Sequence, residues 1–232
     1  MRRTSILAIL FSAGFGLSGL ALAKGPGMAG GVAFKFGPDL AASDWRYMSF
    51  PHRPGVKFTA RGDDTVIVQT NAGVGVLWHP VPRKVSKASK ARWRWRVTEG
   101  VGPTDLTKKG GDDRTLAVYF AFADDKEAVG DIDLVDLLRR KRSDVLMYVW
   151  GGGVKPGTML PLPYFSGRGR TVVKRAANTK SGVWFDEKVD VRGDFRRAFG
   201  RVPGRLVAIA VSSDADDTGG LNVAAVADLC VK

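Results

Sequence analysis

The sequence predicts an all-β protein, an antiparallel β-sandwich of jelly-roll type with one or two short helices. Many short segments alternate apolar and polar residues, as strands with one buried face do. Turn-forming residues separate most of these segments, and few stretches have the 3.6-residue periodicity of an amphipathic helix. Such a series of short strands in one chain is typical of a sandwich.

The segment 92–97, Arg-Trp-Arg-Trp-Arg-Val, is the clearest of the expected strands. Side chains of a strand point alternately to its two faces, so its apolar residues share one face and its arginines the other. Burial of two indoles outweighs anything that exposed ion pairs contribute, and it should set the register. We therefore expect Trp93, Trp95 and Val97 in the core and Arg92, Arg94 and Arg96 on a cationic outer face.

The other elements follow from the same patterns. Asp133 is a suitable N-cap for a helix over residues 134–140, and a short helix over 192–199 should end at Gly200 and Pro203. Alternation and β-propensity predict strands at 32–36, 56–59, 65–70, 75–79, 91–98, 115–123, 145–150, 171–174, 184–191, 206–212 and 222–231.

The N-terminus has the features of an export signal. Arg2 and Arg3 precede an uncharged stretch that ends in the small-residue site Ala21-Leu22-Ala23. A retained membrane anchor is the alternative, but three glycines interrupt the apolar run. We expect residues 1–23 to be a signal peptide cleaved after Ala23, 24–31 a flexible Gly-rich tether, and 32–232 one β-sandwich domain without a transmembrane segment. The expected location is periplasmic or secreted.

Charge and cysteine content limit which disulfides and which binding partners can be expected. The formal net charge is +13, and Cys230 is the only cysteine, so no disulfide can form within the chain. Because exported basic proteins rarely meet nucleic acid, an envelope polysaccharide or an anionic lipid surface is the expected partner. A solvated basic surface without a specific partner is the alternative.

Known catalytic motifs are absent from the sequence. The two histidines, His52 and His79, lack a metal-ligand spacing, and there is no G-x-S-x-G motif. The Gly-rich segment 151–158 superficially resembles a phosphate loop, but Lys155 precedes the last glycine and Pro156 removes an amide donor. We interpret it as a plain loop, and we predict no catalytic residue.

Three acidic groups remain. Asp131 and Asp133 have the two-residue spacing of glucanase carboxylates on a strand, but a helix cap explains Asp133 better. Asp112 and Asp113 could bind metal, or could pair with Arg94 or Arg96, which we favour. A predicted turn carries the oxygen ligands that suit Ca²⁺, although the Glu of an EF-hand loop is missing. A structural Ca²⁺ held by Asp214, Asp216 and Asp217 is the one candidate cofactor.

Aromatic rings offer a second kind of binding group, because a flat ring stacks on the C–H face of a sugar. Trp150 is the preferred platform, since it leads directly into the Gly-rich loop; Trp45, Trp78 and Tyr164 are further candidates. The expected ligand-binding set is Arg92, Arg94, Arg96, Asp112, Asp113, Tyr119, Tyr148, Trp150 and Trp184.

Several of these motifs together resemble the bacterial family DUF3047. They are residues 93–97, Gly111-Asp112-Asp113 leading into 118–122, residues 146–151, Trp184 with Glu187, Asp194-Phe195 with Phe199-Gly200, and the Asp214-x-Asp216-Asp217-Thr218 loop. The resemblance implies an exported jelly-roll domain of carbohydrate-binding type. Ala117 stands where we expect an arginine of the family, so Arg114 is the only nearby substitute, and the segment 125–144 is longer than usual.

Three functions remain open. The leading hypothesis is a non-catalytic binding domain for an envelope glycan or other polyanion. The rival is a jelly-roll glycan hydrolase or lyase that uses Asp112, Asp113, Asp214 and Asp216; it requires carboxylates that converge in an open groove, and it fails if they are buried against arginines. The third is a structural envelope module without a small ligand, in which all aromatic residues are buried.

Overall fold

The computed structural model describes residues 30–126, 133–139 and 141–232. The expected signal peptide, most of the expected tether and Asp131 lie outside these residues.

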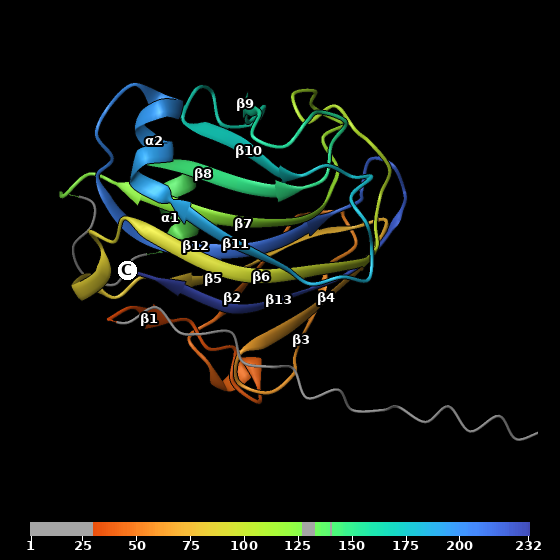
Figure 1. Cartoon of the computed structure of the whole chain (residues 1–232), viewed down its shortest axis with the longest axis horizontal. Coiled ribbons are helices and arrows are strands. Elements are labelled where there is room, and N and C mark those ends of the chain that lie inside the picture. Colours follow the sequence, from red (N-terminus) through yellow and green to blue (C-terminus); the bar gives the residue numbers. More distant parts are fainter. Residues whose placement is uncertain (1–29, 127–132, 140) are drawn as a thin grey trace, which may run out of the picture.

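Two β-sheets face each other and form a sandwich (Figure 1). The six-stranded sheet has the order β11 (Phe185–Asp190), β6 (Lys90–Glu99), β13 (Leu221–Val231), β4 (Thr65–Asn71), β3 (Lys57–Ala60), with β1 (Val32–Ala33) paired to β13. The seven-stranded sheet has the order β2 (Arg46–Ser49), β5 (Val74–Pro80), β12 (Arg205–Asp214), β7 (Arg114–Ala123), β8 (Ser143–Trp150), β10 (Gly169–Arg175), β9 (Met159–Pro161).

The jelly-roll-type β-sandwich and its two short helices are confirmed. The pairing is antiparallel except between β8 and β10, which run parallel, because β9 lies between them in the chain and pairs antiparallel with β10 at the edge of the sheet. The sequence patterns missed β2 and β9, two short strands at the edges of the seven-stranded sheet. The first expected strand is shorter than its pattern, since only Val32–Ala33 pairs.

The core between the sheets is built on aromatic rings. Trp93 and Trp95 of β6 are both 0 % exposed, which confirms the register expected from the alternation. Trp95 contacts Trp93 and Trp150 edge to face, with ring centroids 5.4 and 5.8 Å apart, and Trp93 packs against Tyr148. The indole N–H of Trp95 donates to the buried carboxylate of Glu187, 3.1 Å away, so the one polar atom of this side chain is also satisfied.

The two middle strands of the seven-stranded sheet, β7 and β12, carry larger side chains inside and several alanines outside. On β7, Leu116, Val118 and Phe120 belong to the core between the sheets, whereas Ala117 and Ala121 belong to a second cluster on the outer face. The same alternation on β12 places Ile209 and Val211 inside and Ala208 and Ala210 outside. These small side chains therefore leave a depression in the outer face along the middle of the sheet.

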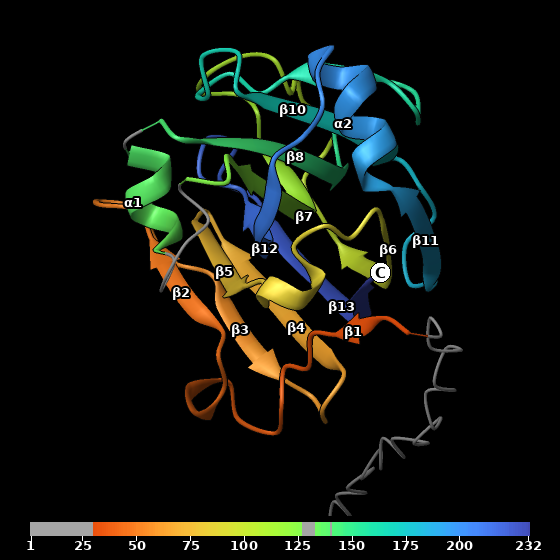
Figure 2. The ribbon, with the colours of Figure 1, turned by 90° about the vertical axis from the view of Figure 1, so that its left-hand side faces the viewer.

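Two helices cover different parts of the sandwich (Figure 2). Helix α1 (Leu134–Arg139) packs on the outer face of the seven-stranded sheet, and Asp133 accepts hydrogen bonds from the N–H groups of Val135 and Asp136, as the cap prediction requires. Helix α2 (Val191–Phe199) begins at its N-cap Asp190, ends at Gly200 in the left-handed conformation, and buries Phe195 against Phe122. Two 3₁₀ turns, Leu40–Ala42 and Arg83–Val85, complete the helical elements of the described residues. None of the helices described here has the length and apolar character needed to cross a membrane.

Replacement of Trp95 tests the core. Trp95→Ala should lower the free energy of unfolding by roughly 3–5 kcal/mol, because it leaves a large cavity and removes a donor from buried Glu187. Trp184→Ala is the control: this half-exposed indole stacks on Arg94 and Arg96 at the surface, so its loss should cost about 1–2 kcal/mol. Urea unfolding measures both, and equal losses would contradict the core assignment.

Candidate functional site

A pocket of about 670 Å³ opens on the outer face of the seven-stranded sheet. The outward alanines of β7 and β12 leave room for it, since Ala121, Ala208 and Ala210 line its floor. Its walls come from α1, from the loop that precedes β7, from the loop that follows β9 and from the loop that follows β12. The size lies within the range of about 300–1,000 Å³ that small-molecule sites have.

Arg114 lies at the centre of the polar end of this pocket. Its Nη1 contacts the Asp112 carboxylate at 3.2 Å and the Asp214 carboxylate at 3.0 Å, and it also donates to the Asp112 carbonyl at 2.9 Å. Its Nη2 donates to the hydroxyl of Tyr119 at 3.1 Å, which is 2.8 Å from the Ser212 hydroxyl. Arg114 is buried, so its charge acts at short range on every group of this network.

Burial changes the protonation of these groups. Burial alone would lower the pKa of Arg114, but Tyr119, Asp214 and Asp112 around it more than compensate, and its pKa is raised. Burial raises the pKa of Asp112 despite the opposing effect of Arg114. Burial also raises the pKa of Asp214 to about 7, and the neighbouring Asp216 carboxylate adds to the shift. Asp214 therefore retains a proton close to neutral pH, because burial and the carboxylate beside it both disfavour its charged form.

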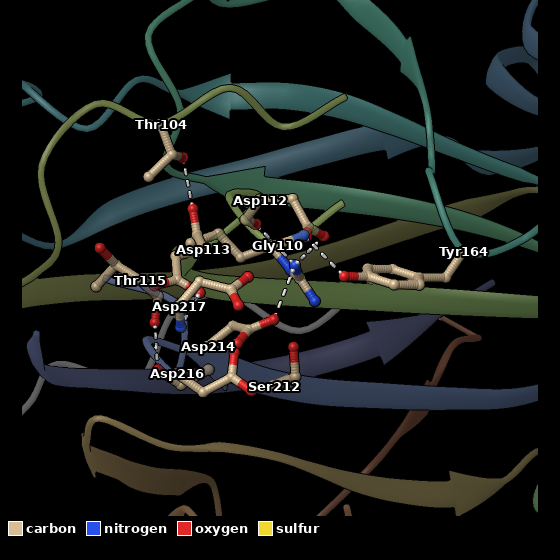
Figure 3. Close-up of polar contacts among 12 residues, drawn as sticks. Thr104, Gly110, Asp112, Asp113, Thr115, Tyr164, Ser212, Asp214, Asp216 and Asp217 are labelled. Carbon is tan, nitrogen blue, oxygen red and sulfur yellow. Dashed lines mark hydrogen bonds and ion pairs between the residues drawn. The ribbon is translucent and has the colours of Figure 1, made fainter. Parts of the chain in front are cut away.

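The loop after β12 brings further carboxylates to the mouth of the pocket (Figure 3). Asp216 forms an ion pair with Arg53 at 3.0 Å, and exposed Asp217 lies beside it. Asp113 holds this loop in place, because its fully buried carboxylate accepts hydrogen bonds from the N–H groups of Asp217 and Thr218 and from the Thr218 hydroxyl. Asp113 is thus a positioning residue behind the pocket and does not line it.

The structure brings together only two of the three expected Ca²⁺ ligands, and a different aspartate joins them. One carboxylate oxygen each from Asp113, Asp216 and Asp217 lies within 4.8 Å of the others, so Asp113 takes the place in this group that we expected for Asp214. Asp214 instead contacts Arg114. Hard cations prefer such oxygen ligands, and Ca²⁺ binding at this loop stays a prediction.

The opposite end of the pocket is apolar. Leu134 and Leu138 of α1 face Leu162 and Phe165 of the loop after β9, and Val145 of β8 lies on the same side. The exposed ring of Tyr164 stands at the rim, where its hydroxyl accepts a hydrogen bond from the Gly110 N–H at 3.0 Å. The pocket therefore has a charged end and an aliphatic end.

Four of the aromatic residues that we expected to stack on a ligand are buried, so the expectation is wrong for them. Trp150 is 1 % exposed and Tyr148 is 0 % exposed, because both point inward from β8 into the core between the sheets. The Tyr148 hydroxyl donates to Asp194 of α2 at 2.7 Å, and burial raises its pKa. Neither ring can stack on a ligand. Trp45 and Trp78 are also buried.

The arginine face of β6 is not the open surface that we expected. Arg92 is only 5 % exposed, and Arg94 forms an ion pair with Asp228 at 2.7 Å. Arg94 and Arg96 both lie over the ring of Trp184, about 5 Å from its centroid. The favoured pairing of these arginines with Asp112 or Asp113 is wrong, because β6 and β7 belong to different sheets and Asp112 pairs with Arg114.

Of the expected ligand-binding set, the pocket brings together Asp112 and Tyr119, with Asp214, Asp216 and Asp217 of the expected metal set. Sequence reasoning missed Arg114 as the centre, Arg53 as a counter-charge and the aliphatic wall. A signal for Arg114 was present: it is the one charged residue in the otherwise apolar strand 114–123, directly after two aspartates. The outward alanines at 117, 121, 208 and 210 were the signal for the hollow itself.

The structure therefore defines the class of protein. It is a β-sandwich with a pocket on one outer face, and this pocket is charged at one end and aliphatic at the other. The model of the family described as "Protein of unknown function (DUF3047)" matches residues 43–230, and the chain belongs to this family. The resemblance found in the sequence motifs is thus confirmed. Arg114, which donates to Tyr119, stands close to the position where Ala117 replaces the expected arginine. No curated protein matches the chain.

Three solved structures are among those to which the chain is similar. The xyloglucanase domain of NopAA from Sinorhizobium fredii is 10 % identical, with a TM-score of 0.46 over 81 % of this chain and 92 % of that one. A Cel12A cellulase variant derived from Rhodothermus marinus is 14 % identical, with a TM-score of 0.43 over 87 % and 99 %. The family 11 carbohydrate-binding module of Lic26A-Cel5E from Clostridium thermocellum is 10 % identical, with a TM-score of 0.41 over 86 % and 94 %. At such low identities and TM-scores these similarities carry no functional argument.

Removal of the central guanidinium tests the network. Arg114→Ala should lower the free energy of unfolding by roughly 3–5 kcal/mol at pH 8, because it leaves buried Asp112 and Asp214 without their counter-charge. Arg53→Ala removes an arginine that is half exposed, and should cost only ~0.2–1 kcal/mol. Denaturant unfolding compares the two variants, and a loss at Arg114 no larger than that at Arg53 would contradict the central role of Arg114.

The protonation of Asp214 predicts a pH dependence of stability. Its pKa rises from 3.8 in the unfolded chain to about 7 in the fold, so the folded state holds a proton that the unfolded state releases. The contribution of Asp214 to stability should therefore fall as pH rises from about 4 to 7, and level off above. Asp214→Asn abolishes this titration. The difference in melting temperature, wild type minus variant, should decrease across that window, and a constant difference would refute the shifted pKa.

Proposed function

We propose that the protein is a periplasmic or secreted binding domain that takes a carbohydrate-type ligand into the pocket on its seven-stranded sheet. The observation that carries this proposal is the network of Arg114, Asp112, Asp214 and Tyr119 at one end of a concave pocket. A large pocket with a few convergent polar groups and shifted pKa values is the default candidate for a binding site.

The polar groups match the hydrogen-bonding needs of sugar hydroxyls. Each hydroxyl both donates and accepts, and carboxylates beside an arginine supply acceptors and donors within a short distance. Tyr164, which is 57 % exposed, presents a ring at the rim on which a sugar C–H face can stack. The charged network can thus orient a bound sugar, and stacking on the ring can add to the affinity for it.

The same geometry argues against a polyanion as the ligand of this pocket. Four carboxylates, those of Asp112, Asp214, Asp216 and Asp217, line it beside Arg114 and Arg53. Even with Asp214 protonated, three carboxylates remain beside two arginines, so the polar end is not positive and it repels an anionic group. The arginines of β6, which prompted the polyanion hypothesis, lie on the other sheet and are paired or stacked.

Binding is favoured over hydrolysis. The hydrolase hypothesis requires carboxylates that are free in an open groove, whereas Asp112 and Asp214 are each ion-paired with buried Arg114. The third hypothesis, a structural module, requires that all aromatic residues are buried, whereas Tyr164 is exposed beside a pocket. Release of new reducing ends from a bound oligosaccharide would instead support the hydrolase hypothesis.

A glycan array followed by calorimetry tests the proposal. The purified protein should bind at least one neutral or amino-sugar oligosaccharide, and the affinity should change little between 50 and 300 mM salt, because no phosphate-like anion is neutralised. Asp214→Asn and Tyr164→Ala should each weaken binding by about tenfold or more, since each removes roughly 1–2 kcal/mol of contact.

Arg96→Ala is the matched control on the other sheet. It removes one of the arginines that we first expected to bind ligand, and its binding affinity should equal that of the wild type. The proposal fails if no glycan binds above background, or if Arg96→Ala weakens binding more than the two pocket variants do.

A further inference from the structure

The aliphatic half of the pocket has no role in the recognition of hydroxyl groups. Leu138 and Phe165 are partly exposed and offer only carbon atoms to a ligand, and the buried side chains of Leu134, Val145 and Leu162 belong to the same apolar lining. A sugar hydroxyl placed among them would lose its hydrogen bonds to water and gain none in return, which is unfavourable. A saccharide alone therefore fits one half of this pocket and is rejected by the other.

We infer that the ligand is an amphiphile, with a hydroxyl-bearing or amino head at the Arg114 network and an alkyl or acyl chain between α1 and the loop after β9. This inference rests on the proposed function of the same pocket and names its ligand class. Apolar surface that stays open to water is unfavourable, and an apolar chain is the complement that removes it from water. Asp112 and Leu138 line the same pocket, so a single molecule can place a polar head at one end and a chain at the other.

The charges of the pocket determine which end takes the head. The carboxylates gather beside Arg114 and Arg53, so the polar end accepts hydrogen-bond donors and disfavours phosphate, sulfate or carboxylate groups. Arg139 and Arg168 are the cationic groups on the aliphatic side. Arg139 is exposed, and Arg168 donates to the Ser143 carbonyl at 2.6 Å. If these two arginines governed recognition, an anionic amphiphile would be preferred, and the experiment has to separate the two cases.

Three probes that share either the head group or the alkyl chain distinguish a neutral amphiphile from an anionic one. They are n-octyl β-D-glucopyranoside, methyl β-D-glucopyranoside and octyl sulfate, each titrated calorimetrically into the full-length protein below its critical micelle concentration. The octyl glucoside should bind at least about tenfold more tightly than the methyl glucoside, because several methylenes leave water. It should also bind about tenfold more tightly than octyl sulfate, because that head is anionic.

Leu138→Gln should remove most of the advantage of the octyl chain and leave the affinity for the methyl glucoside unchanged. Leu221→Gln is the matched control, since Leu221 is an exposed leucine at the start of β13 on the other sheet. Equal affinities for the octyl and methyl glucosides, or no binding of the octyl glucoside by a protein that binds array glycans, would overturn the amphiphile and leave the carbohydrate proposal standing. Preference for octyl sulfate would contradict the proposal that the head group of the ligand is not anionic. Binding that depends on the chain alone, with no effect of Asp214→Asn, would overturn the proposed function itself.

Discussion

The division of large inward and small outward side chains on the middle strands of the seven-stranded sheet is the constraint on which the rest of this structure depends. The inward residues of β7 and β8, such as Phe120, Tyr148 and Trp150, meet Trp93 and Trp95 of the opposite sheet and fill the sandwich. Because successive side chains must point to opposite faces, the outward positions are decided separately, and alanine occupies several of them. One set of strands thus produces both a dense core and a hollow surface.

The hollow becomes a chemically distinct site because a charge is buried at its end. A guanidinium in a low-dielectric environment needs counter-charges, and Asp112 and Asp214 supply them from two segments far apart in sequence. Asp216, which pairs with Arg53 and lies beside Asp214, is placed by the loop that Asp113 holds through its hydrogen bonds to residues 217 and 218. The stability of this end of the sandwich and the polarity of the pocket therefore depend on the same contacts.

The sequence predicted what depends on local alternation. The strands, the core position of Trp93 and Trp95, and the cap at Asp133 all follow from residues close together in the chain. It failed where the outcome depends on which sheet a strand joins. Arg94 and Asp112 are near in sequence but on different sheets, so their expected pairing does not form. Trp150 was expected at a surface because a Gly-rich loop follows it, yet the period-two alternation of β8 already placed it with the inward residues Leu146 and Tyr148.

The contrast between the whole surface and the pocket bears on what the protein can select. The chain has a net charge of +13, so its long-range field attracts anions, but at physiological salt this field is screened beyond about 8 Å. Within the pocket the short-range groups decide, and at its polar end these are four carboxylates beside Arg53 and buried Arg114, whereas Arg139 and Arg168 lie on the aliphatic side. The net charge therefore acts on the approach of any charged partner, whereas the polar network at Arg114 and the aliphatic residues of α1 act at short range on whatever enters the pocket. The two sets of groups are separate, so the net charge of the chain does not indicate the charge of the group that the pocket accepts.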